Sequence, residues 1–450
     1  MGLLTGTGAG SLLRSVIVTE RAHGFCYSGS LYARIPVDDS KPQVIMLAYY
    51  HPPHREIGGL RPFRFRKYLE RMGYRCHLIT ATPQPEPHAG DVTVIRDELG
   101  DLWESSAEGG RLAGKGYVEL LVRQFMFPGH IGFLWSRAAA AECRRIAGEN
   151  PGARCVVFST YPPLGTLLAG MFASGKGMPW IADFRDPLAA LIHGDPRWYV
   201  RWWNRRLERR IFRQAAAIIA NTEPAAAMWK ERYPAERQKL HAIYNGYDPE
   251  ESPRARPIAP RDYKLIVHAG TIYHGRNPNA LIEGIARLRR QNVPEALKAK
   301  VLLLGSTLKF EEVNWPLYEE AQREGWLELR ATVPRDKAQA IVEAADALLI
   351  VQPHTGVQVP GKLFEYVCVG RPVLAIVPRG SPIEMILVNA AVPNVCIYSD
   401  DSREVADRKV LDFLRMPNTP APINDWFRAN FNAEAQARML ARIIDEVVRR

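Results

Sequence analysis

The segment whose residue types and spacing are best suited to binding and chemistry is VPGKLFEYVCVGRPVL, which begins at residue 359. A Pro-Gly turn precedes a helical pattern, so Lys362 and the N–H groups of the first turn, around Gly361 and Leu363, would face an anion. Glu365 follows one turn later, where a carboxylate suits the two hydroxyls of a ribose. A carboxylate in a first turn also suits the helix dipole without any ligand, so a purely structural interpretation stays open.

A second pattern of this kind begins at His268, in the run HAGTIYHGRNP. A strand leads into the small residues Gly270 and Thr271, and the cation Arg276 follows before the next helix. An arginine in this place would neutralise negative charge on a departing diphosphate. The alternative is an ordinary surface arginine.

Two loops earlier in the chain carry further candidates. Gly58 and Gly59 stand between a strand and a helix, where glycines allow backbone N–H groups to approach a phosphate; the alternative is an ordinary turn. Asp183 ends another expected strand, and Arg185 and Asp186 follow it. They would position a hydroxyl or hold a phosphate, and the alternative is a local ion pair that stabilises the loop.

The elements that must position these residues alternate between short β-branched runs and helical patterns. This alternation predicts parallel strands with crossover helices, and such sheets bind ligands at the carboxyl ends of their strands. The first half is expected to have strands at 43–48, 75–80, 92–96, 155–159, 179–183, 217–220 and 239–244. The second half is expected to have strands at 264–269, 301–304, 327–332, 347–351, 372–377 and 395–398.

A length of 450 residues predicts two domains rather than one core. The Pro-rich and charged run from 248 to 262 separates the two halves in which strands and helices alternate, and it indicates a linker. The predicted organisation is an N-terminal extension at 1–40, which is expected to be mobile, a Rossmann-like domain at 41–250, a linker at 251–262, a second Rossmann-like domain at 263–425, and a C-terminal helical segment at 426–450 that could pack back on the first domain.

Composition narrows the classes of partner. The formal charge of +11 and the isoelectric point near 9.4 favour anionic partners, but the usual nucleic-acid-binding motifs are missing, so no nucleic acid is expected. The six isolated cysteines indicate reduced thiols and a cytoplasmic protein. No apolar run reaches the roughly 20 residues of a spanning helix. Neither paired carboxylates in a suitable loop nor a His/Cys cluster suggests a metal, so no metal and no cofactor are expected.

The run PRWYVRWWNRRLERRIFR, at 196–213, combines arginine with tryptophan. This composition is typical of a helix that lies on an anionic membrane. The alternative is a crossover helix that buries an apolar stripe of Val200, Trp203, Leu207 and Ile211 and exposes a basic face. Both interpretations stay open.

Taken together, these segments resemble family 4 of the GT-B glycosyltransferases, and in particular the branch that makes bacterial surface polysaccharides. The resemblance covers about residues 43–448. It rests on seven motifs in order, which are AYYHPPHREIGG, STYPP, ADFRDP, NTEP, NGYD, HAGTIYHGRNP and PGKLFEYVCVGRPVLAI.

The resemblance implies two doubly wound Rossmann-like domains that face each other across a cleft, with the acceptor on the first and the nucleotide sugar on the second. It implies transfer of a sugar, with retention, from a nucleoside diphosphate to a hydroxyl acceptor. By matching positions, Gly58 and Gly59 would meet the donor phosphates. Arg276 and Lys362 would hold the diphosphate, and Glu365 would bind the ribose. The catalytic set so implied is Asp186, Arg185, Arg276 and Lys362.

The sequence departs from the family pattern at two places. Val357 stands where the family has the first glutamate of a pair, and Arg185-Asp186 stands where many relatives have His-Asp. The expected partners are a nucleotide sugar and an acceptor that could be lipid-linked, at the inner face of the cytoplasmic membrane. Two alternatives remain, a nucleotide-sugar epimerase and a non-catalytic scaffold on the same fold.

Overall fold

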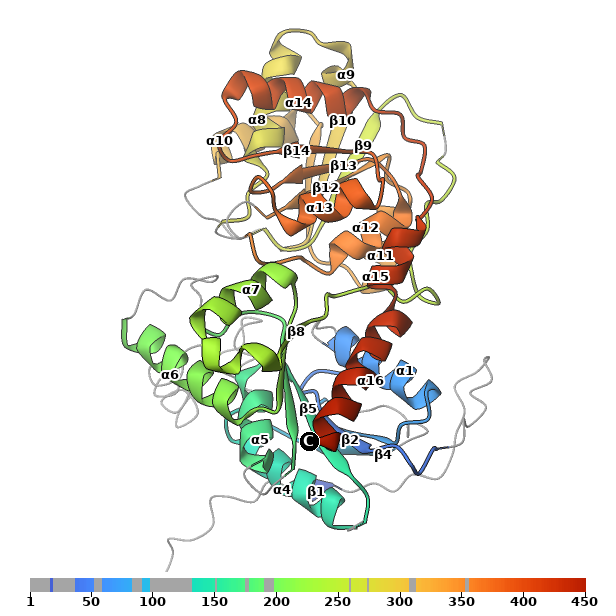
Figure 1. The fold of residues 1–450 in the computed structure, drawn as a ribbon. Helices are drawn as coiled ribbons and strands as arrows, with labels where there is room; N and C mark the ends of the chain where they lie inside the picture. Colours follow the sequence, from blue (N-terminus) through green and yellow to red (C-terminus); the bar gives the residue numbers. More distant parts are fainter. Residues whose placement is uncertain are drawn as a thin grey trace, which may run out of the picture. The chain divides into compact units, whose positions relative to one another are not determined.

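The computed structural model describes residues 17–18, 37–51, 59–82, 91–97, 132–149, 152–174, 178–189, 198–258, 260–272, 275–306, 313–352 and 356–450. The chain divides into two compact units (Figure 1). One unit comprises Met1–Ile219 together with Ala441–Arg450, and the other comprises Ala220–Leu440.

The first sheet has eight strands in the order β1-β4-β3-β2-β5-β6-β7-β8. Their bounds are β1 Ile17–Val18, β2 Gln43–Leu47, β3 Cys76–Thr80, β4 Asp91–Ile95, β5 Cys155–Tyr161, β6 Trp180–Phe184, β7 Ala217–Ala220 and β8 Leu240–Ala242. Strands β4, β3, β2, β5 and β6 run parallel, and the short β1 pairs antiparallel with β4. In this register Met46 lies between Leu78 and Phe158.

Central strand β2 is buried along its whole length, as expected of a parallel strand covered on both faces. The helices before residue 260 are α1 Leu60–Arg71, α4 Trp135–Glu149, α5 Leu164–Ser174, α6 Trp198–Gln214, α7 Glu223–Arg232 and the 3₁₀ helix η3 Pro234–Lys239. Helix α5 packs closely because Gly170 has no side chain: a Cβ there would lie 2.2 Å from Nε1 of Trp180. That indole instead donates to Ser159 Oγ at 2.9 Å.

The second sheet has six parallel strands in the order β11-β10-β9-β12-β13-β14. Their bounds are β9 Lys264–Ala269, β10 Ala299–Leu304, β11 Leu327–Arg330, β12 Ala347–Val351, β13 Val373–Ile376 and β14 Asn394–Ile397. The helices are α8 Asn279–Arg290, α9 Pro294–Leu297, α10 Trp315–Arg323, α11 Arg335–Glu343, α12 Lys362–Val369, α13 Pro382–Asn389, α14 Arg403–Arg415, α15 Asp425–Phe431 and α16 Ala433–Arg449.

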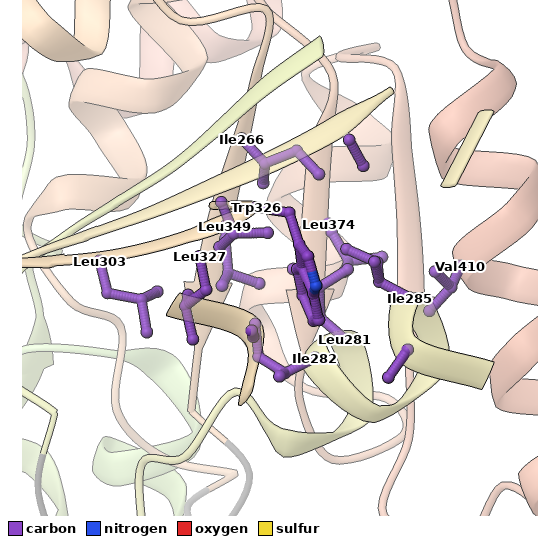
Figure 2. Close-up of a cluster of buried hydrophobic side chains, with 14 of the residues drawn as sticks. Ile266, Leu281, Ile282, Ile285, Leu303, Trp326, Leu327, Leu349, Leu374 and Val410 are labelled. Atoms are coloured by element: carbon purple, nitrogen blue, oxygen red, sulfur yellow. The ribbon is translucent and has the colours of Figure 1, made fainter. Parts of the chain in front are cut away.

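Helices cover both faces of this sheet. Successive strand residues point to opposite faces, so each strand contributes to two cores. Leu349 joins a core with residues of α8, α10 and α14, part of which is drawn in Figure 2. Its neighbours Leu348 and Ile350 join a second core with residues of α12 and α13. The order β11-β10-β9-β12-β13-β14 is that of a doubly wound Rossmann sheet, whose connections change direction between β9 and β12.

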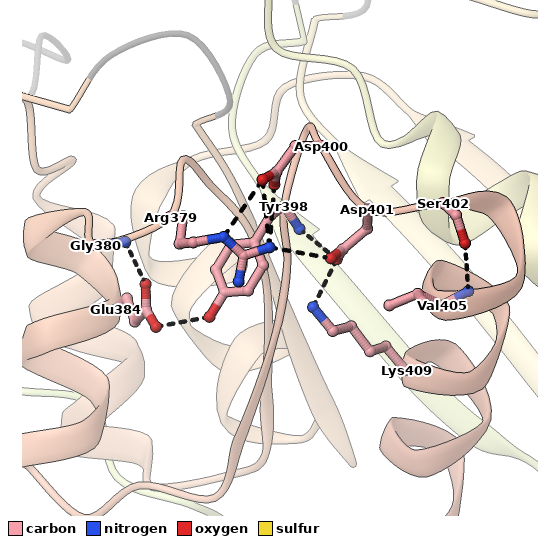
Figure 3. Close-up of polar contacts among 9 residues, drawn as sticks. All are labelled: Arg379, Gly380, Glu384, Tyr398, Asp400, Asp401, Ser402, Val405 and Lys409. Atoms are coloured by element: carbon pink, nitrogen blue, oxygen red, sulfur yellow. Dashed lines mark hydrogen bonds and ion pairs between the residues drawn. The ribbon is translucent and has the colours of Figure 1, made fainter.

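A closed polar network ties the ends of β13 and β14 to the helices that follow them (Figure 3). Tyr398 Oη donates to Glu384 Oε1 at 2.6 Å, and Lys409 Nζ lies 2.6 Å from Asp401 Oδ2. The Arg379 guanidinium stacks over the Tyr398 ring, with its central carbon 4.1 Å from the ring centroid. The cations Arg379 and Lys409 meet carboxylates and the Tyr398 ring, and Glu384 accepts from the Tyr398 hydroxyl and the Gly380 N–H, so the network holds the loops together.

All thirteen predicted strands are present, and their ends differ from the expected ones by a few residues at most. The predicted fold class, two doubly wound α/β sheets, is confirmed. Within the described residues, none of the helices combines the length and the apolar character needed to cross a membrane.

Candidate functional site

The connections at the centre of the second sheet bring two of the predicted motifs together. Strands β9 and β12 are neighbours, with Ile266 beside Ala347. The chain leaves β9 toward one face of the sheet and β12 toward the other, and sheets of this kind bind ligands where the connections diverge in this way. Gly270 follows β9 directly, and Lys362 begins the helix that follows β12.

Lys362 lies against the backbone of Gly270. Gly270 has φ +145°, a conformation that favours glycine, and a Cβ at this position would lie 2.1 Å from Lys362 Nζ. Gly305, at the end of β10, supports it from behind, since a Cβ there would lie 2.7 Å from the carbonyl carbon of Gly270. Two glycines therefore create the space that the ammonium group occupies.

His268, the fifth residue of β9, faces the same ammonium group. Its Nδ1 lies 2.9 Å from the carbonyl oxygen of Leu349, and its Nε2 lies 3.4 Å from Lys362 Nζ. His268 was not among the residues predicted to form the site. The available signal was a polar residue inside an apolar strand, immediately before the small-residue turn.

Basic side chains lie close together in this site. Burial, followed by the charge of Arg276, lowers the pKa of Lys362 to about 7, while Glu365 acts in the opposite direction. Burial lowers the pKa of His268 well below its ordinary value, and the charges of Lys362 and then Arg276 contribute to this. A bound anion would relieve the repulsion between these groups.

Helix α12 is fixed to the end of β9. The N–H of Ala269 donates to Tyr366 Oη at 3.0 Å, and burial raises the pKa of this phenol. Leu363 is fully buried and its N–H already donates to the Pro360 carbonyl at 3.0 Å, so its backbone is engaged within the turn. A Cβ on Gly361 would meet no heavy atom of the described residues within 4 Å, so the chain is open to a ligand there.

Glu365 and Thr271 lie at the edge of this site. Glu365 is partly exposed, and its Oε1 lies 3.2 Å from a guanidinium nitrogen of Arg335 on α11. Thr271 is exposed at the end of the β9 turn. Val357, at the position of the family's first glutamate, accepts a hydrogen bond from Thr222 Oγ1 through its carbonyl at 2.5 Å. The structure thus brings Gly270, Lys362 and Arg276 together, with Glu365 one turn away.

The glycine pair in the first unit has a structural explanation in part. Gly58 lies outside the described residues. Gly59 precedes α1, and a Cβ there would lie 3.0 Å from His51 Cα and 3.1 Å from the carbonyl carbon of Tyr50. This backbone approach alone accounts for a glycine at position 59.

The charged residues at the carboxyl end of β6 divide into two groups. Asp183 is fully buried and accepts two hydrogen bonds from Arg61 and one from Thr160, all at 2.9 Å. Arg185 donates to the carbonyl oxygens of Tyr161 and Pro162 at 3.2 and 2.8 Å.

Asp186 is partly exposed. Burial, and next the charge of Asp186, raise the pKa of Tyr161, which places this carboxylate close to the phenol. The structure therefore groups Arg185 and Asp186 around Tyr161, and Asp183 belongs to a separate ion pair.

Helix α6 carries its tryptophans on the outside. Trp198, Trp202 and Trp203 are 72, 55 and 43% exposed. The expected apolar stripe is buried at the other positions, Val200, Leu207 and Ile211, so Trp203 departs from it. The single acid of this helix, Glu208, is buried and accepts from the N–H of Ala189 at 3.0 Å.

No group of three or more His, Cys, Asp or Glu side chains is arranged to hold a metal ion in the part of the chain that the structure describes.

Comparison with known proteins is consistent with these features. Residues 63–251 match the family model of Glycosyltransferase Family 4. The predicted resemblance to this family is therefore confirmed over these residues. None of the curated proteins compared with the chain matches it.

Solved structures share the fold at low sequence identity. Sucrose-phosphate synthase from Thermosynechococcus elongatus superposes with a TM-score of 0.59 at 14% identity, covering 90% of this chain and 98% of that one. A UDP-forming α,α-trehalose-phosphate synthase from Burkholderia xenovorans gives 0.56 at 13%, covering 90 and 100%. WaaG, a glycosyltransferase involved in lipopolysaccharide biosynthesis, gives 0.51 at 14%, covering 90 and 98%.

Proposed function

We propose that the protein transfers a sugar from a nucleoside diphosphate to a hydroxyl acceptor, with retention of configuration at the anomeric carbon. The observation that carries this proposal is the position of Lys362. It lies beside Gly270 and near Arg276, where the connections after β9 and β12 leave the second sheet toward opposite faces. The family match over residues 63–251 supports sugar transfer as the reaction class.

The proposed chemistry needs charge stabilisation on one side of the breaking bond. The bond between the anomeric carbon and the diphosphate oxygen breaks, and the diphosphate leaves with both bonding electrons. A new bond forms from the acceptor oxygen to that carbon, and the proton of the acceptor hydroxyl passes to the departing diphosphate. Lys362 and Arg276 would stabilise the departing diphosphate, and Glu365 would accept hydrogen bonds from the ribose hydroxyls. Because two cationic side chains can meet this demand, we propose that the transfer is metal-independent.

The donor site is tested by measuring binding of UDP, GDP, ADP and TDP to the wild type and to Glu365→Ala. We expect one nucleotide to bind selectively and the variant to bind it about tenfold more weakly, which corresponds to about 1.4 kcal/mol. The matched control is Glu328→Ala, an exposed glutamate on β11 that also pairs with an arginine. Equal affinity in wild type and Glu365→Ala would contradict the ribose assignment.

Products identify the reaction class. We expect the selected nucleotide sugar to be stable with the protein alone and to be consumed when an acceptor is supplied. Release or rearrangement of the sugar with donor alone would instead favour an epimerase.

We propose a lipid-linked acceptor at the inner face of the cytoplasmic membrane, in the synthesis of surface polysaccharide or glycolipid. Support comes from α6, where six arginines accompany the exposed tryptophans. Trp198 and Trp202 are four residues apart and Arg206 lies four further on, with its guanidinium carbon 5.5 Å from the Trp202 ring centroid. The aromatic and basic side chains thus share one face, as on a helix that rests in an anionic membrane interface. Each cation near such a surface contributes about 1 kcal/mol.

Sedimentation with lipid vesicles tests this surface. We expect wild type to bind vesicles containing anionic lipid and to bind neutral vesicles weakly, with binding reduced at high salt. The triple change of Trp198, Trp202 and Trp203 to alanine should reduce binding at least tenfold. Val388→Ala, which removes a 61% exposed side chain from α13, is the matched control and should bind like wild type. Undiminished binding by the triple variant would contradict a membrane role for α6.

A further inference from the structure

The hydrogen-bonding state of His268 is fixed by its neighbours. The Leu349 carbonyl can only accept, so the Nδ1 atom 2.9 Å away carries the hydrogen of the neutral ring. The lone pair of Nε2 then points toward Lys362 Nζ, 3.4 Å away. Because His268 is only 2% exposed, the ring offers Lys362 an acceptor from inside the protein rather than from solvent.

The opposite side of Lys362 Nζ is bounded by backbone. Gly270 leaves the space into which the ammonium group fits, and Gly305 holds Gly270 in place. A flexible lysine side chain is thus kept in one position by a histidine acceptor on one side and a glycine backbone on the other. This arrangement reduces the conformational entropy that a ligand would otherwise have to remove from the side chain.

We propose that His268 is a positioning residue that holds Lys362 for the donor diphosphate, and that Lys362 Nζ takes up one proton from solvent when a nucleoside diphosphate binds. This inference rests on the proposed function, because it assigns the diphosphate to the Lys362 site. The proton balance is simple: a neutral amine and one proton from the buffer give the ammonium group, and no other bond changes.

The charged groups around Lys362 support this. His268 faces it from β9, Arg276 from the loop after β9, and Glu365 from α12, where Glu365 is paired with Arg335 of α11. Burial and Arg276 lower the pKa of Lys362 to about 7, so the free protein holds it mainly as the neutral amine at higher pH. A diphosphate brings opposite charge and favours the ammonium form. The complex then holds one more proton than the free protein, so affinity should fall up to about tenfold per pH unit above pH 7.

Calorimetry measures this proton directly. UDP, GDP, ADP and TDP are titrated into the full-length protein at pH 8.5, in two buffers with different heats of ionisation. A terminal phosphate ionises near pH 6, so the nucleotide itself contributes little at this pH. We expect close to one proton taken up per nucleotide bound by wild type. In Lys362→Arg the guanidinium is always charged, so uptake should be close to zero.

A double-mutant cycle tests the role of His268. We expect His268→Ala to weaken nucleotide binding about tenfold, and His268→Gln, which retains an acceptor, to recover part of that loss. In the Lys362→Ala background, His268→Ala should change affinity less than twofold, because a positioning residue acts only through the group that it positions. Thermal unfolding of each variant identifies any that fail to fold. If His268→Ala does not fold, the cycle is measured with His268→Gln instead.

The outcomes separate this inference from the proposed function. Normal nucleotide binding by wild type with no proton uptake at pH 8.5, or a full tenfold loss from His268→Ala in the Lys362→Ala background, would overturn the inference and leave the proposed function standing. Absence of binding by folded wild type would overturn both.

Discussion

Each unit of the molecule places an arginine or lysine cluster at the carboxyl ends of its central strands, and the two clusters differ in their charge balance. In the first unit, Arg61 donates two hydrogen bonds to Asp183, and Thr160 donates a third. In the second unit, Lys362 lies within the field of another cation, Arg276. The first cluster is neutral and closed, whereas the second accumulates positive charge.

This difference indicates which cluster stabilises the fold and which binds a ligand. A buried carboxylate whose oxygens are both engaged by the protein has its hydrogen-bonding needs met in the free state. A lysine with its pKa lowered to about 7 is held at a free-energy cost, which a bound anion offsets. The cluster around Asp183 should therefore affect stability, and the cluster around Lys362 should affect nucleotide binding.

Asp183→Ala should have the largest effect of the single changes. It leaves the Arg61 guanidinium buried without its carboxylate, which is expected to lower the free energy of unfolding by about 3–5 kcal/mol. Chemical denaturation measures this. Asp400→Ala is the matched control, because its partner Arg379 is 60% exposed and an exposed pair contributes about 0–1 kcal/mol. A loss below about 1 kcal/mol for Asp183→Ala would erase the contrast between the two clusters.

Gly270→Ala should act on the second cluster. The added Cβ would overlap Lys362 Nζ, and the φ of +145° disfavours alanine by about 1–3 kcal/mol. We expect the protein to fold with reduced stability and to bind nucleoside diphosphate at least tenfold more weakly. Gly356→Ala is the control, since a Cβ there meets no atom of the described residues within 4 Å. If both variants bind nucleotide alike, Lys362 is not confined by Gly270.

Arg335→Ala should have the smallest effect. Arg335 and Glu365 are 46 and 34% exposed, and such pairs contribute little to stability. We expect the free energy of unfolding to change by less than about 1 kcal/mol and nucleotide affinity to change less than twofold. A large loss of affinity would show that Arg335 itself contacts the ligand, and the site would then have to be extended onto α11.

Much of the fold follows from the sequence, because buried parallel strands are short β-branched runs with turns on either side. The run ALLIV became β12, and Gly370 ends α12 with φ +72°, as a helix-ending glycine does. The family resemblance assigned Arg276 and Lys362 to one diphosphate, and the structure brings the β9 turn against Lys362 because both lie where the strand order reverses.

Other features depend on tertiary contacts that no local pattern records. His268 acquires its role from the Leu349 carbonyl of a neighbouring strand and from a lysine almost a hundred residues away. Asp183 looked like a ligand-binding residue beside Asp186, but its partner Arg61 is 122 positions away in sequence. Gly59 is explained by the backbone of His51, which the sequence shows only as part of the same loop.

In the proposed donor site, Lys362 holds the diphosphate of a nucleotide donor. Its most direct test is to titrate wild type and Lys362→Ala with UDP, GDP, ADP and TDP, and with the corresponding nucleosides. We expect at least one diphosphate to bind wild type, Lys362→Ala to weaken that binding by about 10²-fold, and the matching nucleoside to bind both proteins alike. Equal affinity of the diphosphate for the two folded proteins would show that Lys362 does not hold the diphosphate.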